Sequence, residues 1–225
     1  MWRIHPVGKN LVTMVGISSF GLIVLSYFLF PPWPSVVAMI FFFSFYLLVR
    51  YFFRYPERKI VKNLDSRNVI SPADGVIVVN EMVDMDVFPE GKARQISIFM
   101  RLWDVHLNYV PVEGQIMQVR HFKGKHLAAF LPKSSLHNEH VDYFIKTSSG
   151  IILVREIAGL IACRIVPLVN ENESHKAGDE LGFIKFGSRV DIFLPPSSEV
   201  QVQQGQIVKG GLTQLAILPL SSEKF

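Results

Sequence analysis

Three positions in this 225-residue chain carry side chains that could perform nucleophilic or acid–base chemistry. Ser188 follows Gly187, so its hydroxyl lies beside a peptide carbonyl that no side chain shields. Asp74 and His106 offer a carboxylate and an imidazole, groups that proteins use to move protons. Taken singly, each also has an ordinary interpretation. Gly-Ser and Asp-Gly are typical of turns, and a lone histidine in a strand-like run is commonly a packed residue.

Metal binding has little support in the sequence. His137 and His140 form an i,i+3 pair in the segment HNEH, which is a conceivable metal pair, but no third ligand follows at a readable spacing. Cys163 is the single cysteine, so a disulfide within the chain and a cysteine-based zinc pattern are both excluded. We therefore expect no metal site, and nothing in the chain requires an oxidising compartment.

The composition points toward a membrane. Apolar residues make up 49% of the chain and charged residues only 19%. The net charge of +4 and the pI of about 9.2 suit an anionic lipid surface. No basic stripe interleaved with aromatic residues is present, so we do not expect nucleic acid as a partner.

Two uncharged apolar segments near the N-terminus predict a transmembrane helical hairpin. The expected helices cover about residues 11–30 and 35–53, with the proline-rich sequence PPWP at 31–34 between them. Arg50 lies near the end of the second helix, where its side chain can reach the lipid headgroups. A cleaved signal peptide is the alternative, but two apolar blocks without a small-residue cleavage pattern argue against it.

Positive charge flanks the hairpin at both outer ends and is absent from PPWP. The positive-inside rule then places both ends of the hairpin in the cytoplasm. The rest of the chain is expected on the cytoplasmic face of the cell (inner) membrane, close to the bilayer. The flanking basic residues are Arg3, Lys9, Arg50, Arg54, Arg58 and Lys59.

From about residue 68, short β-rich runs alternate with glycine, proline and aspartate turns, which is typical of a sandwich or barrel. Residues 124–138 are the least strand-like and predict a loop with a short helix. We therefore expect a β-dominated α+β protein: a membrane anchor over 1–59, and a barrel-sandwich-like β domain over 60–225. The sequence pattern near the C-terminus, in which turns are followed by strands, also occurs in lipoyl and biotinyl carriers.

Three separated motifs together resemble one enzyme family. They are SPADG at 71–75, LWDVHLNYVPVEG at 102–114 and FGSRVDIFLP at 186–195, preceded by FFRYPER at 52–58. In this order and spacing they resemble the short-form phosphatidylserine decarboxylase proenzyme family, which is pyruvoyl-dependent and self-cleaving. The resemblance covers nearly the whole chain from about residue 50. FGSRVD combined with SPADG is fairly specific, although neither motif would be alone.

The resemblance implies that the chain cuts itself between Gly187 and Ser188. Residues 1–187 and 188–225 would stay together as a heterodimer, and Ser188 would become a covalent pyruvoyl group, the implied cofactor. That group would form a Schiff base with phosphatidylserine, the implied membrane substrate, and its decarboxylation would give phosphatidylethanolamine.

The resemblance also gives roles to the two proton-transfer candidates. Asp74 would help to activate Ser188 for cleavage, and His106 would contact substrate or protonate the reaction intermediate. The chain departs from the long branch of the family at Tyr109, where that branch has a second histidine. Either His106 therefore serves both steps, or cleavage relies on Asp74 without a histidine relay.

Other functions remain as alternatives at this stage. An archaetidylserine decarboxylase would perform the same head-group chemistry on ether lipids. A non-catalytic, membrane-tethered barrel-sandwich carrier or binding domain would need a modified lysine beside an acidic residue at a hairpin tip, and Lys209 lacks that neighbour. A catalytically inactive lipid-binding relative is disfavoured by the intact Gly187-Ser188 pair and Asp74.

Overall fold

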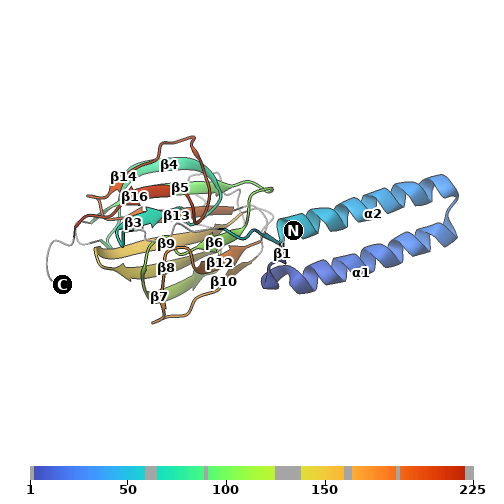
Figure 1. Ribbon diagram of the computed structural model, residues 1–225, viewed down its shortest axis with the longest axis horizontal. Helices are drawn as coiled ribbons and strands as arrows, with labels where there is room; N and C mark the ends of the chain where they lie inside the picture. Colours follow the sequence, from blue (N-terminus) through green and yellow to red (C-terminus); the bar gives the residue numbers. More distant parts are fainter. Residues whose placement is uncertain are drawn as a thin grey trace. The chain divides into compact units, whose positions relative to one another are not determined.

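The computed structural model describes residues 3–58, 65–88, 91–124, 138–159, 164–185 and 188–220. The chain divides into two compact units, Met1–Glu57 and Arg58–Phe225. The first unit is helical and the second is built from β-strands (Figure 1). Each unit is described on its own below.

The first unit is a helical hairpin of α1 (Pro6–Leu29) and α2 (Pro32–Phe52). Both helices begin earlier than their apolar segments suggested, because proline is accepted in the first turn of a helix, where its missing N–H has no intrahelical partner. The strands β1 (Arg3–Ile4) and β2 (Arg54–Tyr55) pair antiparallel and join the two open ends of the hairpin.

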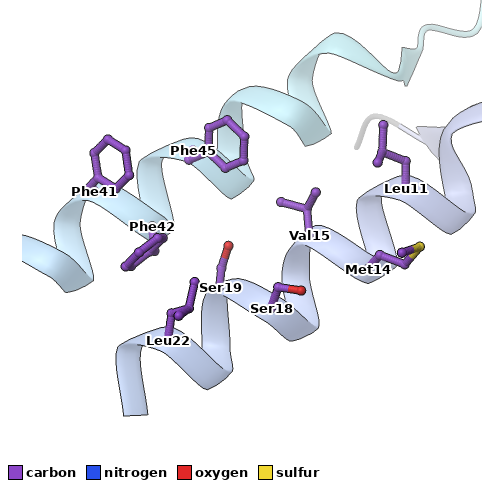
Figure 2. A pocket seen from close by; sticks show the side chains of 9 residues that line it. All are labelled: Leu11, Met14, Val15, Ser18, Ser19, Leu22, Phe41, Phe42 and Phe45. Carbon is purple, nitrogen blue, oxygen red and sulfur yellow. The ribbon is translucent and has the colours of Figure 1, made fainter. Parts of the chain in front are cut away.

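Small residues let the two helices approach each other closely. A Cβ added to Gly16 would lie only 3.1 Å from the Tyr46 ring, and Ser35 Oγ donates a hydrogen bond of 2.8 Å to the Ser26 carbonyl. Close backbone approach and interhelical hydrogen bonds are the usual means of joining helices in lipid. A shallow apolar groove remains between the helices, as Figure 2 shows; it is lined by Leu11, Met14, Val15, Ser18, Ser19, Leu22, Phe41, Phe42 and Phe45.

Both helices are long and apolar enough to cross a membrane. Most of their large apolar side chains are exposed, including Phe20, Phe28 and Phe41. A soluble helix would bury such side chains against a core. The hairpin predicted from the sequence is confirmed as a structural element, and its composition indicates association with a membrane.

The second unit contains one large antiparallel sheet and two small ones (Figure 1). The large sheet has eight strands in the order β11-β7-β8-β9-β13-β5-β4-β15, and the small sheets have the orders β10-β12-β6 and β14-β16-β3. The strands are β3 (Asn68–Ile70), β4 (Gly75–Asp84), β5 (Lys92–Met100), β6 (Leu107–Tyr109), β7 (Gly114–Phe122), β8 (His140–Thr147), β9 (Gly150–Ala158), β10 (Ile165–Pro167), β11 (Ser174–His175), β12 (Glu180–Ile184), β13 (Ser188–Leu194), β14 (Glu199–Val200), β15 (Ile207–Val208) and β16 (Gln214–Ile217).

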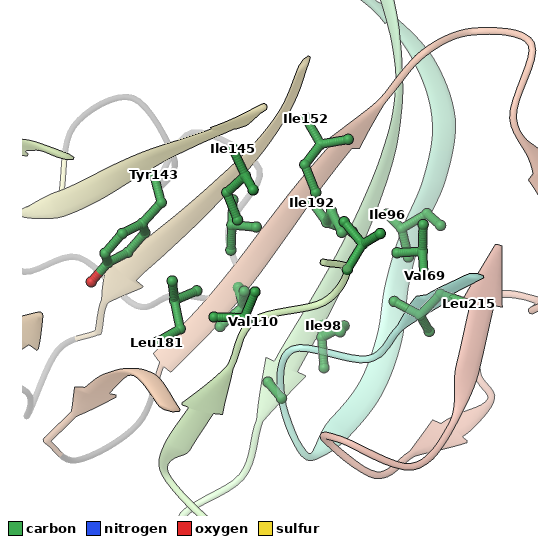
Figure 3. Close-up of a cluster of buried hydrophobic side chains, with 14 of the residues drawn as sticks. Val69, Ile96, Ile98, Val110, Tyr143, Ile145, Ile152, Leu181, Ile192 and Leu215 are labelled. Atoms are coloured by element: carbon green, nitrogen blue, oxygen red, sulfur yellow. The ribbon is translucent and has the colours of Figure 1, made fainter. Parts of the chain in front are cut away.

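The core lies between the inner face of the eight-stranded sheet and the two small sheets. Figure 3 shows side chains of the large sheet, such as Ile98 and Ile192, meeting Leu181 of β12 and Leu215 of β16. The large sheet curls so that the small sheets can cover its concave face. The strand-rich, barrel-sandwich-like fold expected from the alternation of short runs and turns is therefore confirmed.

All seven residues of β13 are buried, so both of its faces are covered. Ser188, Val190 and Ile192 belong to the inner face, with the core. Arg189 and Asp191 belong to the outer face, because side chains alternate along a strand. The motif SRVD therefore places its first and third residues inside and its two charged residues outside.

Candidate active site

Ser188 is the first residue of β13 and lies at one end of the large sheet. Its partners in register are Met100, the last residue of β5, and Ala158, the last residue of β9. The side chain is fully buried, and Oγ donates to the Met100 sulfur at 3.0 Å. A thioether is a weak acceptor, so this hydroxyl is held loosely for a buried polar group.

Asp74 lies at the same end of the sheet, one residue before β4. Strand β5 separates β4 from β13, so the backbones of β4 and β13 are about 10 Å apart, or two strand spacings. Gly75, the next residue, passes so close to β5 that an added Cβ would collide with the Phe99 carbonyl. Glycine at this position permits the close approach of the Asp74 turn to β5.

The carboxylate of Asp74 is clamped by two groups. Arg58 Nη1 and Nη2 donate to its two oxygens at 2.7 Å each, and the Gly210 amide donates to Oδ1 at 2.8 Å. Arg58 also donates to the Gly210 carbonyl, and its guanidinium lies 5.2 Å from the centre of the Tyr109 ring. Burial alone would lower the pKa of Arg58, but the hydrogen bonds and charge of Asp74 outweigh burial and raise it.

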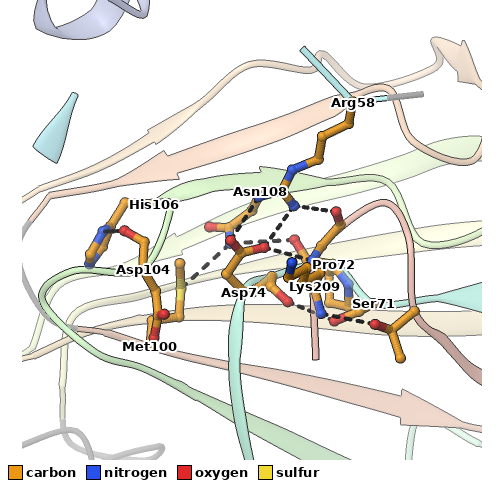
Figure 4. A network of polar contacts seen from close by, with 12 residues as sticks. Arg58, Ser71, Pro72, Asp74, Met100, Asp104, His106, Asn108 and Lys209 are labelled. Atoms are coloured by element: carbon orange, nitrogen blue, oxygen red, sulfur yellow. Dashed lines mark hydrogen bonds and ion pairs between the residues drawn. The ribbon is translucent and has the colours of Figure 1, made fainter. Parts of the chain in front are cut away.

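The segment that carries Asp74 is bound on two sides by backbone hydrogen bonds. Ser71 pairs with Thr213 and Gly211, and the Pro72 carbonyl accepts from the Tyr109 amide at 2.8 Å. Figure 4 shows this segment with Arg58, Asn108 and Lys209 around it. The SPADG turn is therefore fixed relative to β6, the strand that follows His106.

His106 is fully buried just before β6. Its Nδ1 lies 3.0 Å from the Asp104 carbonyl, which can only accept, so Nδ1 carries the proton in this bond. In the neutral ring Nε2 is then the basic nitrogen. The Asp104 carboxylate binds Arg101 and helps to hold the turn that presents the imidazole.

Met100 joins these segments. Its sulfur accepts from Ser188 Oγ and also lies 3.6 Å from Asn108 Nδ2, while the same amide group lies 3.5 Å from the Pro72 carbonyl. The start of β13 and strand β6 thus both contact the Met100 sulfur, and Asn108 links that sulfur to Pro72 of the SPADG segment. Figure 4 shows Met100, Asn108 and Pro72. Asn108 Oδ1 is buried and has no hydrogen-bond partner among the described residues.

Some residues singled out in the sequence lie elsewhere or outside the description. Gly187 and His137 are outside the described residues. His140 is on β8, where its ring stacks on Phe122 with the centres 4.6 Å apart. Within the described ranges, no group of three histidine, cysteine, aspartate or glutamate residues could hold a metal ion.

Sequence reasoning missed two residues beside the site. Arg58 was noted only as a positive flank of the hairpin, although it binds Asp74. Glu156 was passed over inside the apolar run IILVREI, although a charged residue in a strand buried on both faces is unusual enough to attract notice. Its surroundings are described below.

Comparisons with known proteins fit this geometry. The family model for phosphatidylserine decarboxylase matches residues 45–216. The phosphatidylserine decarboxylase proenzyme of Porphyromonas gingivalis is 41% identical over 219 residues, which cover 96% of this chain and 99% of that protein. The proenzymes of Cytophaga hutchinsonii and Parabacteroides distasonis are 40% and 44% identical, over 95% and 77% of this chain and 97% and 79% of their own lengths.

Proposed function

Because the chain belongs to the phosphatidylserine decarboxylase family, we propose that it converts phosphatidylserine to phosphatidylethanolamine and carbon dioxide. The observation that carries this proposal is the meeting of SPADG, HLNY and the start of β13 around Met100. Hydrogen bonds thus link three segments far apart in sequence around the Ser188 hydroxyl, and two of these segments also carry Asp74 and His106. Such convergence of candidate catalytic segments favours a catalytic site over a passive binding domain.

We infer that the protein first cuts itself at Gly187-Ser188. The Ser188 hydroxyl attacks the Gly187 carbonyl, so a carbon–oxygen bond replaces the peptide carbon–nitrogen bond. Elimination then releases residues 1–187 with a new C-terminal carboxylate. Water hydrolyses the residue that remains at position 188, and the nitrogen of that residue leaves as ammonia. Residues 188–225 would begin with a pyruvoyl group, and the two chains would stay together as strands of one sheet.

The surroundings of Ser188 fit this conversion. When the Ser188 hydroxyl is converted, the Met100 thioether loses the hydrogen bond that it accepted from this hydroxyl. Because a thioether is a weak acceptor, the loss costs little stability. The facing residue Ala158 has a small side chain, which leaves room beside position 188. A pyruvoyl group supplies an electrophilic carbonyl that can withdraw electrons from a bound amine.

We assign proton transfer to Asp74 and His106. Asp74 would act on the Ser188 hydroxyl, or orient the group that does so, and Arg58 would hold its carboxylate in place. Because both carboxylate oxygens already accept hydrogen bonds from Arg58, the pair must rearrange before Asp74 can take a proton. His106, with Nδ1 bound to the Asp104 carbonyl, offers Nε2 as an acceptor for a proton from the substrate amine.

The hairpin would hold the domain at the bilayer that contains its substrate. Both helices can span a membrane, and the basic residues lie in or beyond the outer ends of the two helices, away from the turn that joins them. By the positive-inside rule, the β domain would face the cytoplasm from the inner membrane. A reporter fused after Phe225 that is active only outside the cytoplasm should stay silent.

The proposal is tested with purified full-length protein in detergent micelles containing phosphatidylserine. A denaturing gel should show two chains, and carbon dioxide should be released from the serine head group. Ser188→Ala should stay as one chain and release none, whereas Ser174→Ala, an exposed control on β11, should match the parent protein. Active protein that remains a single chain would refute the cleavage proposal.

A further inference from the structure

Glu156 on β9 is a buried carboxyl group to which the proposed reaction gives no role. Its side chain is fully buried, and Tyr143 OH donates to Oε2 at 2.7 Å. Oε1 has no hydrogen-bond partner within the part of the chain that the structure describes. Burial raises the pKa of Glu156 to about 8, and the Tyr143 hydrogen bond offsets this only in part. Near neutral pH the group is therefore mainly an uncharged acid.

The position of Glu156 on the sheet brings it close to Ser188. On β9 and β13, Glu156 faces Val190 and Ala158 faces Ser188, so all four share the inner face. Glu156 and Ser188 are thus diagonal neighbours, with Cβ atoms about 7–8 Å apart. Ala158 and Val190 occupy the other two corners beside that diagonal, and Ala158 contributes only a methyl group.

A bare stretch of β12 makes room for the carboxyl group. A Cβ added to Gly182 would lie 2.5 Å from Glu156 Oε1, 2.6 Å from Oε2 and 2.8 Å from Tyr143 OH. Gly182 pairs in register with Asn108, whose Oδ1 also lacks a partner among the described residues. Two unpaired buried oxygens therefore lie near one glycine, and the amide of Asn108 reaches the sulfur that holds Ser188.

Packing alone does not explain this arrangement. A buried polar atom without a partner costs on the order of 1–3 kcal/mol. The residues opposite Glu156 on the two neighbouring strands are apolar: Val141 on β8 and Val190 on β13. Among the described residues, Tyr143 is the titratable group that faces the Glu156 carboxyl. An apolar side chain would fill this space at lower cost, and costly ionisable groups of this kind concentrate at functional sites.

We propose that Glu156 is the acid of the reaction, the group whose proton replaces the departing carboxyl group. This inference rests on the proposed function. The bond between the head-group carbon and its carboxyl group breaks, and carbon dioxide leaves. The electron pair then forms a new carbon–hydrogen bond with the Glu156 proton. The resulting carboxylate keeps the Tyr143 hydrogen bond and regains a proton from solvent.

Glu156 and His106 then have opposite tasks. His106 has its Nδ1 proton committed to a carbonyl, so its other nitrogen is suited to accept a proton. Glu156 is neutral and has an oxygen without a partner, so it is suited to give one. The two groups are thus suited to the two halves of an acid–base pair, His106 as proton acceptor and Glu156 as proton donor.

The test uses cleaved, full-length protein and Glu156→Gln, which keeps the shape of the side chain and an acceptor for Tyr143. The variant should be cut normally, and its rate of carbon dioxide release should fall by about 10²–10⁴-fold. Ile152→Val, a mild change on the same face of β9, should leave both properties unchanged. A variant with the parental rate, or one that is folded but uncleaved, would overturn the proposal.

Infrared difference spectroscopy gives a second readout that does not depend on turnover. The parent protein should show a neutral carboxyl band that disappears as pH rises through about 8 and is missing in Glu156→Gln. A Glu156 that is already ionised at pH 6 would also overturn the proposal. If the parent protein is cleaved but releases no carbon dioxide, the proposed function fails, whereas the band still reports the state of Glu156.

Discussion

On the two faces of the sheet around β13, buried polar groups have opposite kinds of surroundings: they are fully paired on the outer face and weakly or partly paired on the inner face. On the outer face, Asp191 accepts two hydrogen bonds from Arg189, at 2.6 and 3.1 Å, and lies opposite Arg155. Arg155 in turn donates hydrogen bonds to both carboxylate oxygens of Asp142. The inner face has instead the loosely held hydroxyl of Ser188 and, diagonally from it, the half-paired carboxyl of Glu156.

This difference separates stabilising groups from reactive ones. Each charge in the outer ladder of Asp142, Arg155, Asp191 and Arg189 has an oppositely charged partner. The ladder can therefore stabilise the sheet, but its charges are already paired and are not available to a substrate. The inner groups have weak or missing partners, which costs stability and leaves them available to a substrate. Substitutions on the two faces should therefore have different consequences.

The largest expected effect is on the inner face. Ser188→Ala removes the attacking oxygen, so self-cleavage and decarboxylation should both be lost completely. Relative to uncleaved parent chain, the thermal midpoint should hardly change, because among the described residues the Ser188 hydroxyl donates to a thioether, a weak acceptor. The measurements are a denaturing gel, a carbon dioxide assay and a melting curve on one preparation, and a cleaved variant would remove Ser188 from the mechanism.

His106→Gln should come next in size. The amide can still donate a hydrogen bond but cannot take up a proton, so decarboxylation should fall by about 10²–10⁴-fold. The variant should be largely cleaved if His106 serves only the substrate. An uncleaved, inactive variant would show that His106 acts first on Ser188, and full activity would exclude it from the reaction.

On the outer face, Asp191→Asn should act on stability. The change leaves Arg189 and Arg155 as buried charges with one fewer partner, which typically costs about 3–5 kcal/mol in the free energy of unfolding. Protein that remains folded at low temperature should still cleave itself. Normal stability with loss of cleavage would contradict the division between the two faces.

The pH dependence of stability should sharpen the comparison. The pKa of Glu156 is about 8 in the folded protein and 4.5 in a model compound, so folding favours its neutral form. The contribution of this group to stability is complete below pH 4.5 and is lost as pH rises toward 8. From pH 5 to 8, the melting midpoint of the parent protein should fall more than that of Glu156→Gln; parallel curves would contradict the buried neutral acid.

The smallest expected effect concerns the clamp on Asp74. Asp74→Asn should slow cleavage by about 100-fold, at the lower end of what proton transfer contributes. Arg58→Gln leaves the carboxylate in place and frees it from its ion pair, so cleavage should continue. Equal losses of cleavage in both variants, followed by time courses on gels, would mean that Asp74 only holds the turn together.

The sequence predicted the helical hairpin and the β-rich domain because both depend on local patterns. Uncharged apolar segments of membrane length, and short β-rich segments between turns, can be recognised in the sequence without tertiary information. The limits of α1 and α2 differ from the predicted ones, because proline breaks a helix interior but is accepted in a first turn, as Pro32 is in α2.

The surroundings of the candidate residues were beyond local patterns. The contacts of Asp74 with Arg58 and Gly210 join positions far apart in the chain, and no periodicity encodes them. Glu156 looked like an ordinary strand residue, because its burial depends on Gly182 and Tyr143 on other strands. Strand alternation could place Ser188 and Arg189 on opposite faces of β13, but not say which face held the reactive groups.

The most direct test of the account is the intact mass of the small chain from purified, active protein. Cleavage at Gly187-Ser188 with conversion of the serine predicts the mass of residues 188–225 with an N-terminal pyruvoyl group in place of serine. Edman degradation of this chain should fail, because it has no terminal amine. A small chain that begins with an unmodified Ser188 amine, or active protein with the mass of the whole chain, would contradict the central claim.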